Sequence, residues 1–540
     1  MKTRFVLKKW YLIPTVILLL FAGLIVAIAL QPRIDTTRTA SIALGQEPSS
    51  LDPAISLTID ARSYISNMYE GLTNIAEDGT LNPGVADNWS TNDDKTEYTF
   101  TLRDNAVWSD GTPLTANDFK YSWLRVLNPD TASGWASFLY YIKGAQEYND
   151  GTASAKQVGI EVVDDQKLKV TLTSSNSFFG AMTALQPYFP VKESVVAADP
   201  EAWATKPETY ISNGAFKLSR WDHDSQIIVV RSEEYWNRPK VYLAQIDFKL
   251  FSEPAVVTSA FESGELTYVG KVIPSEQMKQ VSELKNSNFA YTKFLSPNLN
   301  SAALKDEDVR KALSIALDRQ AIATTVGDSE PLLSFIPQGF TNTAEKVDFR
   351  KDGHKETYLS SSSNIYEAKK LLAQKGYTES NPLKLTYLTN TSGANVALSE
   401  VVKEQLKKAN VEVEIQAYES KVFNTYRKEK KYDLVAASWA AEYPDISSYL
   451  YEFTSTDSNN YPGFKNNEYD NLYKSLVSEQ EGAKKYEIAH QAEDLLLNSY
   501  SVFPLYYQPD AYIVDGNFTG YYQDSTGSLV LRNAYFKSEE

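Results

Sequence analysis

Strand-like and helix-like segments alternate through residues 383–439, and this alternation constrains the fold more than any other feature of the chain. Apolar or alternating patterns predict strands at residues 383–389, 411–417 and 432–438. Amphipathic patterns predict the intervening helices at residues 396–408 and 421–430. Because strands joined by helical crossovers lie parallel in one sheet, an α/β domain is predicted here.

Two of the predicted strands end in segments that are expected to share one crevice. Residues 390–393 (NTSG) follow the first strand, and residues 439–443 (WAAEY) follow the third. Ligands of parallel sheets bind just outside the carboxyl ends of the strands. The segment WAAEY, in which Glu442 follows a tryptophan and two alanines, is therefore predicted to lie at a ligand site.

The size and charge of the chain limit its architecture and its partners. Its 540 residues exceed the usual single-domain range of about 100 to 200, so two or three domains are expected. The net charge of −16 opposes binding to nucleic acids, whose phosphates need a basic surface. The abundant aromatic side chains, which include 35 tyrosines, fit either core packing or an aromatic-lined ligand cavity.

The sequence offers no signature of catalysis and no cofactor site. Cysteine is absent, and the three histidines, His223, His354 and His490, lie far apart without metal-ligand spacing. We find no nucleophile elbow, zinc-protease motif, phosphate-binding loop, dinucleotide fingerprint or EF-hand loop. A carboxylate pair for glycoside hydrolysis stays open, because sequence does not show which of the 69 acidic residues lie together. We therefore expect a binding protein without metal or cofactor, rather than an enzyme.

The N-terminus carries a basic segment and then an apolar one. Four lysines and arginines lie within residues 1–9, and residues 10–30 are uncharged. An apolar helix of about 20 residues spans a bilayer, and its basic flank stays on the cytoplasmic side. We favour an uncleaved membrane anchor followed by a linker at residues 31–39, which places the remaining chain outside the cell. Cleavage after Ala29 is the alternative, and it would release a secreted or periplasmic protein.

Further elements are predicted outside the alternating region. Thr115, with Asp118 as its acidic partner, is predicted to cap a helix at residues 116–127. Three acidic residues favour the N-terminus of another helix, which begins near Asp306. Strands are predicted at residues 98–102, 167–172 and 226–230.

The segment YTFTLRDNAVWSDGTPLTANDFKYSW, at residues 98–123, resembles the oligopeptide-binding proteins. These are extracytoplasmic receptors of ABC importers in the dipeptide, oligopeptide and nickel group, solute-binding protein family 5. The resemblance covers nearly all of residues 40–535. It continues in order through SLDP (50–53), YEGL (69–72), PGVADNW (83–89), NPDTAS (128–133), SNGAFKL (212–218), DVRKALSIALDR (308–319) and YDLVAASWAAEYPD (432–445).

The resemblance implies a two-lobed α/β fold of the periplasmic-binding-protein type, a Venus flytrap with an additional α/β domain inserted in the first lobe. The first lobe would combine residues 40–59, 186–290 and 508–540. The additional domain would span residues 60–185, and the second lobe residues 291–507. The alternating region would then lie in the second lobe, and a peptide would be held between the lobes.

The block WAAEY carries the main contacts that the resemblance implies. Glu442 stands where the family pattern usually has an aspartate, an acid that accepts the free α-ammonium of the peptide. Trp439, Ala440 and Ala441, with Tyr443 beyond, resemble the segment that pairs with the ligand backbone as a β-strand. Small side chains suit this pairing, because a peptide can approach and exchange main-chain hydrogen bonds while its own side chains enter pockets.

Other segments supply further candidate peptide contacts by resemblance. GQEPSSLDP matches a ligand-lining segment, which points to Gln46, Glu47 and Pro48, although a simple loop role stays open. Trp135 and Tyr140 resemble aromatic residues that face the cavity from the additional domain, and core packing is their alternative.

A cation for the peptide's C-terminal carboxylate is also implied. Arg427 occupies a position where relatives offer an arginine, and a solvated helix charge is its alternative. A second arginine that some relatives carry is Ala436 here, which makes longer peptides compatible with the site.

The sequence thus predicts a monomeric receptor that captures oligopeptides and delivers them to an ABC permease whose ATPase lies on separate chains. The membrane would be reached through the N-terminal helix. A receptor for a signalling peptide, a dipeptide, a metal chelate or an oligosaccharide is the alternative within binding proteins. An exported carboxylate-pair hydrolase and a surface chaperone or adhesin are alternatives from other classes.

Overall fold

The computed structural model describes residues 36–537 apart from residues 46, 252–253, 271–274, 328, 339, 343–346, 355–357, 392, 444, 458, 480–481 and 525. The predicted anchor at residues 10–30 and the cleavage site after Ala29 lie outside this part of the chain. Among the helices that the structure describes, none is both long and apolar enough to cross a membrane.

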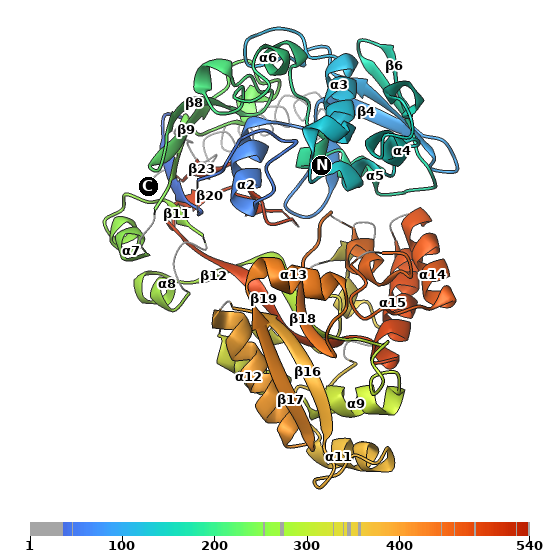
Figure 1. The fold of residues 1–540 in the computed structure, drawn as a ribbon. Coiled ribbons are helices and arrows are strands. Elements are labelled where there is room, and N and C mark those ends of the chain that lie inside the picture. The colour runs from blue at the N-terminus through green and yellow to red at the C-terminus, as the bar shows by residue number, and fades with distance from the viewer. Residues whose placement is uncertain are drawn as a thin grey trace, which may run out of the picture.

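The chain folds into two lobes, an upper and a lower one in the view of Figure 1. A single eleven-stranded sheet runs through both lobes. Its order is β17 (Val411–Tyr418), β16 (Leu383–Asn390), β18 (Leu434–Trp439), β12 (Lys285–Pro297), β19 (Phe503–Val514), β11 (Tyr268–Val269), β1 (Thr39–Ala43), β10 (Gln245–Lys249), β9 (Gln226–Arg231) and β8 (Phe216–Asp222), with β13 (Glu330–Pro331) paired to β19.

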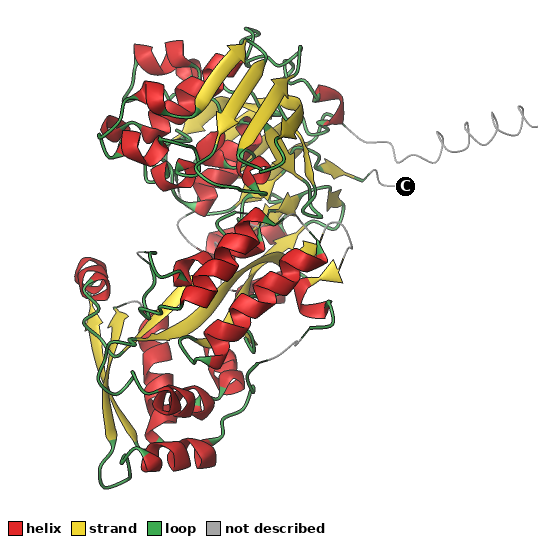
Figure 2. Cartoon of the chain, turned by 90° about the vertical axis from the view of Figure 1, so that its right-hand side faces the viewer, coloured by secondary structure: helices red, strands yellow, loops and turns green. Residues whose placement is uncertain are grey.

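Strands β12 and β19 connect the lobes. They pair antiparallel from Leu295 opposite Phe503 to Lys285 opposite Tyr512, with a register shift between Asn286 and Ala290. In the lower lobe β12 borders β18, whereas in the upper lobe β19 borders β11. Figure 2 shows these long strands passing between the two bodies. Residues 290 and 508, where the sequence-based lobe boundaries fall, thus lie inside the connecting strands.

The lower lobe contains the predicted alternation of strands and helices. Strand β16 pairs parallel with β17 over eight residues and with β18 at two positions, so the predicted parallel arrangement is confirmed. The crossovers are α12 (Gly393–Lys407) and α13 (Ser420–Lys428). Buried side chains of α12, such as Leu398 and Val402, belong to the apolar core beneath the sheet, which explains why this amphipathic segment folds as a crossover.

The predicted cap at Thr115 and the predicted helix start near Asp306 are also confirmed. In α9 (Glu307–Ala316) the Asp306 side chain accepts the backbone N–H groups of Asp308 and Val309, and the apolar stripe of the helix is buried. In α3 (Ala116–Leu127) the backbone N–H of Thr115 donates to the Asp118 carboxylate at 2.7 Å. These caps fix the helix starts because they satisfy N–H groups that have no partner within the helix.

The upper lobe holds a second, separate sheet. It is four-stranded and antiparallel, in the order β4 (Ala86–Thr91), β5 (Glu97–Leu102), β7 (Lys167–Thr171) and β6 (Ile160–Asp164), and Figure 1 shows it beside α3.

The remaining α-helices of the two lobes are α2 (Ile59–Met68), α4 (Ala145–Asn149), α5 (Phe179–Met182), α6 (Glu193–Ala198), α7 (Pro254–Glu262), α8 (Ser275–Val281), α10 (Arg319–Val326), α11 (Ile365–Gln374), α14 (Asn467–Ser478) and α15 (Ala483–Asn498). Short two-stranded pairs join β2 (Thr73–Ile75) to β3 (Leu81–Pro83), β14 (Thr341–Asn342) to β15 (Val347–Asp348), β20 (Phe518–Thr519) to β23 (Tyr535–Phe536), and β21 (Tyr522–Gln523) to β22 (Leu529–Val530).

Candidate ligand-binding site between the lobes

The carboxyl ends of β16 and β18 meet, as the sequence predicts. The ammonium group of Lys293, on β12, donates to Asn395 Oδ1 at 2.9 Å and to Ser438 Oγ at 3.2 Å. Asn395 lies just after β16, and Ser438 lies at the end of β18. Both strand ends therefore contribute to one surface of the lower lobe.

Glu442 lies three residues beyond β18, in a narrow cavity between the lobes. It is the lower-lobe residue of this cavity, and the remaining lining comes from upper-lobe segments that are distant in sequence. These lining residues are Arg62, Ser66, Trp135, Phe138, Ala184, Leu185, Gln186, Pro187, Asp524, Thr526 and Ser528. The structure thus brings together Glu442 and Trp135, both of which are candidate peptide contacts by resemblance.

Glu442 is held by two hydrogen bonds within its own lobe, one to its carboxylate and one from its backbone. The Tyr451 hydroxyl donates to Oε2 at 2.5 Å, and the Glu442 backbone N–H donates to Ser448 Oγ at 2.8 Å. Burial raises the pKa of Glu442, and the Tyr451 hydrogen bond and the charge of Arg62 offset part of this rise. A cation placed in the cavity would stabilise the ionised carboxylate.

Arg62, on α2, is a cation that faces this carboxylate from the upper lobe, and sequence reasoning missed it. Burial lowers the pKa of Arg62, while Asp524, Tyr291 and Glu442 favour its charged form. Its guanidinium carbon lies 5.9 Å from the ring centroid of Trp135. Within the described residues, its Nε makes no hydrogen bond.

Two further acids lie close to Glu442. Glu452 is completely buried, and neither of its carboxylate oxygens has a hydrogen-bond partner among the described residues. Burial, followed by the charges of Asp457 and Glu442, raises the pKa of Glu452 well above its usual value. Glu452 therefore favours its neutral form, which leaves Glu442 as the lower-lobe acid that lines the cavity.

Among the described residues, no strand pairs with the end of β18 on the side that faces β16. Toward β12, Ser438 and Trp439 pair with Lys293 and Thr292, whereas the pairing of β18 with β16 stops at Val435. The Trp439 ring is buried in the lower-lobe core, and its Nε1 donates to the backbone carbonyl of Ser448 at 2.7 Å. Ala440 is half-buried and Ala441 is buried.

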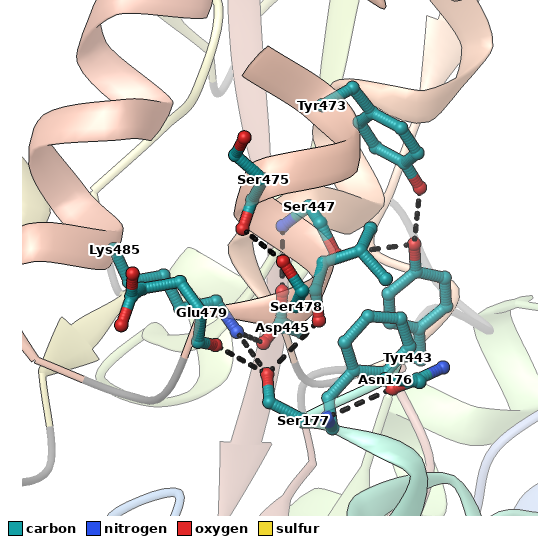
Figure 3. A network of polar contacts seen from close by, with 12 residues as sticks. Asn176, Ser177, Tyr443, Asp445, Ser447, Tyr473, Ser475, Ser478, Glu479 and Lys485 are labelled. Carbon is teal, nitrogen blue, oxygen red and sulfur yellow. Dashed lines mark hydrogen bonds and ion pairs between the residues drawn. The ribbon is translucent and has the colours of Figure 1, made fainter. Parts of the chain in front are cut away.

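Tyr443 joins the two lobes directly. Its ring stacks on Phe178 of the upper lobe, with centroids 4.8 Å apart and planes 6° apart. Next to this stack, the Ser177 backbone N–H donates to the carbonyl of Val477 at 3.1 Å. Figure 3 shows the surrounding network, in which Lys485 forms a buried ion pair with Asp445. We call Ser177, Phe178, Tyr443 and Val477 the lobe contact.

The segment after β1 has a structural role that the sequence did not indicate. The carboxylate of Glu47 accepts hydrogen bonds from Trp221 Nε1 at 2.7 Å and from the Asp224 backbone N–H at 2.9 Å, and it lies 2.6 Å from His223 Nδ1. It therefore anchors the turn between β8 and β9. Pro48 is buried, and Gln46 lies outside the described residues.

The remaining candidates are placed apart from Glu442. Tyr140 is not among the residues that line the cavity, and its hydroxyl donates to Asn149 Oδ1 at 2.6 Å. Arg427, on α13, donates to Asn424 Oδ1 at 3.0 Å, and its guanidinium carbon lies 4.7 Å from the ring centroid of Tyr461. Trp135, by contrast, lines the cavity while its Nε1 donates to the carbonyl of Ser56 at 2.8 Å.

In the described ranges, no cluster of three or more histidine or acidic side chains is arranged to hold a metal ion.

The comparisons with known proteins agree with this architecture. A family model described as bacterial extracellular solute-binding proteins, family 5 middle, matches residues 80–461. The chain belongs to this family. Among the relatives in family 5, the dipeptide-binding protein DppE of Bacillus subtilis (strain 168) is 32% identical over 495 residues, which cover 90% of each chain. The resemblance read from the sequence blocks is thereby confirmed.

Solved structures of family 5 proteins match in fold over nearly the whole chain. The periplasmic murein tripeptide-binding protein MppA, in its unliganded open form, gives a TM-score of 0.81 at 29% identity, covering 94% of this chain and 98% of that one. Haemophilus influenzae OppA in complex with the peptide RPPGFSPFR gives 0.72 at 27% identity, covering 94% and 100%. The two-lobed α/β fold is thus that of the periplasmic binding proteins.

Proposed function

We propose that the chain is an extracytoplasmic receptor that captures oligopeptides between its lobes and delivers them to an ABC permease. The observation that carries this proposal is Glu442, an acid that lies at the carboxyl end of β18 in the cavity between the lobes. The relatives of the chain include a dipeptide-binding protein and an oligopeptide-binding protein whose structure holds a peptide. ATP hydrolysis belongs to the partner subunits.

Glu442 accepts the α-ammonium of the peptide in this mechanism. The incoming ammonium supplies the positive charge that the buried carboxylate needs, and it competes with Arg62 for that carboxylate. The ligand backbone pairs with the chain just beyond β18, at Ala440 and Ala441, so side-chain identity has little influence on this part of the binding.

Closure of the lobes around the peptide completes the mechanism. The chain matches the unliganded open MppA structure with a higher TM-score than peptide-bound OppA, 0.81 against 0.72. This difference supports an open arrangement for the free receptor. Binding then favours the closed arrangement, because only there do both lobes contact the ligand, and the permease recognises the closed form.

Several further assignments form part of the same proposal. Gln46, Glu47, Pro48, Trp135 and Tyr140 are assigned as further peptide contacts from the upper lobe, and Arg427 as a cation that α13 offers to the peptide. The first lobe comprises residues 40–59, 186–290 and 508–540, the additional domain residues 60–185, and the second lobe residues 291–507. A helix at residues 10–30 tethers this monomeric receptor to the membrane.

Calorimetry with tetraalanine and N-acetyl-tetraalanine tests the proposal. The free amine is expected to bind about 10- to 100-fold more tightly, because a hydrogen bond to a charged group contributes about 1.5 to 3 kcal/mol. Glu442→Gln should remove this preference. Equal affinity of the two peptides for the wild-type protein would exclude the Glu442 role, and hydrolysis of either peptide would exclude a pure receptor.

A further inference from the structure

Arg62 is a cation in the cavity between the lobes that lacks a direct partner. It lies on α2 of the upper lobe and lines the cavity that Glu442 reaches from the lower lobe. Among the residues that the structure describes, its side chain makes no hydrogen bond and no ion pair, and its Nε is buried. A guanidinium carries five N–H donors, and those that face the cavity are free to bind an acceptor.

The upper lobe fixes the position of the Arg62 side chain. The N-cap of α2 is Thr58, whose Oγ1 accepts a hydrogen bond from the Ala61 backbone N–H at 3.2 Å. The Arg62 guanidinium carbon lies 5.9 Å from the ring centroid of Trp135, and that ring is anchored by a hydrogen bond to the Ser56 carbonyl. A capped helix and an anchored ring therefore present this charge to the cavity.

Two acids face Arg62, and in the described ranges neither forms an ion pair with it. The carboxylate of Asp524 is engaged in its own turn, because Oδ1 accepts the backbone N–H groups of Thr526 and Ser528, both at 2.9 Å. Glu442 faces Arg62 from the lower lobe and favours its charged form. The cavity thus has a cation on one lobe and an anion on the other, without a direct bond between them.

A peptide ammonium at Glu442 would change the electrostatic environment of Arg62. It would neutralise one of the acids that favour the guanidinium charge, and it would bring a second positive charge into the same cavity. A carboxylate on the same ligand residue would offset both effects, because it can face Arg62 while the ammonium faces Glu442. Arginine suits this role, since its planar guanidinium binds a carboxylate through two parallel hydrogen bonds.

We propose that Arg62 selects peptides whose first residue is aspartate or glutamate, by binding the side-chain carboxylate of that residue. This inference rests on the proposed function, because it requires the α-ammonium of the peptide to lie at Glu442. A neutral first residue leaves Arg62 without an anion, and a lysine adds another positive charge. The affinity should therefore fall from acidic through neutral to basic first residues.

Calorimetry at pH 7 with three tetrapeptides tests this order. Each peptide ends in three alanines, and the first residue is aspartate, its uncharged isostere asparagine, or lysine. The wild-type protein is expected to bind the aspartate peptide at least about tenfold more tightly than the asparagine peptide, and the lysine peptide most weakly.

Substitutions of Arg62 separate a role in selection from a role in folding. Arg62→Met should bind the aspartate and asparagine peptides alike, and it should bind the lysine peptide more tightly than the wild type does. A damaged site would not gain affinity, so this gain is specific to the loss of the charge. Arg62→Lys should keep a smaller preference for aspartate, since it retains the charge without the planar guanidinium.

Arg220→Met is the matched control for Arg62→Met. Arg220 is also an upper-lobe arginine, on β8, but its side chain is 63% exposed and pairs with Asp222. This variant should bind the three peptides in the same order as the wild type, with the same differences in affinity.

Three results would overturn the inference. Equal wild-type affinity for the aspartate and asparagine peptides, with the free-amine preference for tetraalanine intact, would remove Arg62 from the site and leave the proposed function standing. A preference for the aspartate peptide that survives in Arg62→Met would assign its carboxylate to another cation. If the wild type binds none of the peptides, the proposed function fails, and the inference fails with it.

Discussion

The ring of Phe178 stacks on the ring of Tyr443, with centroids 4.8 Å apart, and this pair joins the upper and lower lobes. Tyr443 directly follows Glu442, the proposed ammonium acceptor. A movement of the backbone at Glu442 therefore also moves one partner of the lobe contact. We therefore expect ligand binding at Glu442 to be coupled to the relative position of the lobes through these two neighbouring residues.

A double-mutant cycle measures the strength of the lobe contact. We expect Phe178→Ala and Tyr443→Ala to lower the free energy of unfolding, with a coupling between them of about 0.5 to 1.5 kcal/mol, as for other buried aromatic pairs. Urea unfolding of the wild type, both single variants and the double variant gives this coupling. Additive effects of the two substitutions would show that the rings contribute independently.

The ion pair beside this stack should be critical for stability. The Lys485 and Asp445 side chains are 2% and 4% exposed, so Lys485→Met leaves a buried carboxylate without its cation. We expect a loss of about 3 to 5 kcal/mol in the free energy of unfolding.

Lys484→Met provides the matched control for that substitution. Lys484 is the preceding residue, its side chain is 74% exposed, and it pairs with Glu479, so the expected loss is at most about 1 kcal/mol. The double variant Asp445→Asn, Lys485→Met should recover part of the stability, since it removes the buried charge. Similar losses in the free energy of unfolding for Lys484→Met and Lys485→Met would contradict the expectation that burial makes the Lys485–Asp445 pair critical for stability.

Local patterns and topology could be read from the sequence because they depend on neighbouring residues. The cap formed by Thr115 and Asp118 uses two positions three residues apart, and it forms as predicted. The parallel pairing of β16 and β18 follows from the helical crossovers that join the strands, and it places Glu442 beyond the carboxyl edge of the sheet.

The partners of Glu442 could not be read from the sequence, because they lie on distant segments. Arg62 and Asp524 approach from two ends of the upper-lobe sequence, and no spacing rule relates them to residue 442. Glu47 was selected by resemblance, yet its carboxylate is bonded to the turn between β8 and β9, a contact across 174 residues from Glu47 to Trp221. Lys293 belongs to no motif, and its lowered pKa arises from burial, which no acidic group among the described residues offsets.

The hydrogen bond from Tyr451 to Glu442 predicts a pH effect on ligand binding. Burial raises the pKa of Glu442, and the bond from the Tyr451 hydroxyl opposes this rise. Tyr451→Phe therefore raises the pKa further, and the carboxylate becomes neutral at a higher pH. As the pH falls from 8 to 4.5, the affinity for tetraalanine should decrease earlier in Tyr451→Phe than in the wild type.

Calorimetry across this pH range is the measurement, with N-acetyl-tetraalanine as the control. The acetylated peptide lacks the ammonium, so its binding should not depend on Tyr451. Superimposable pH profiles of the wild type and Tyr451→Phe would show that the Tyr451 hydroxyl does not affect the pKa of Glu442.

His490 should make the stability of the lower lobe depend on pH. Its ring is 2% exposed and stacks on Phe349 and His354, and its Nε2 lies 2.7 Å from the carboxylate of Asp352. Burial is the largest influence and lowers the pKa of His490, with Arg350 and His354 acting in the same direction and Asp352 opposing them. The folded protein therefore holds the neutral ring at a pH where the unfolded chain already binds a proton.

The consequence is a loss of stability on acidification, which one substitution isolates. As the pH falls below about 6.5, the unfolded state gains a proton that the folded state does not, so the free energy of unfolding decreases by at most about 1.4 kcal/mol per pH unit. His490→Phe keeps an aromatic ring against Phe349 but cannot titrate, so its urea-unfolding free energy should fall less steeply between pH 7 and 5. Equal slopes of the unfolding free energy against pH for the wild type and His490→Phe would show that His490 has the same pKa in the folded and unfolded states. Burial would then not shift the pKa of this ring.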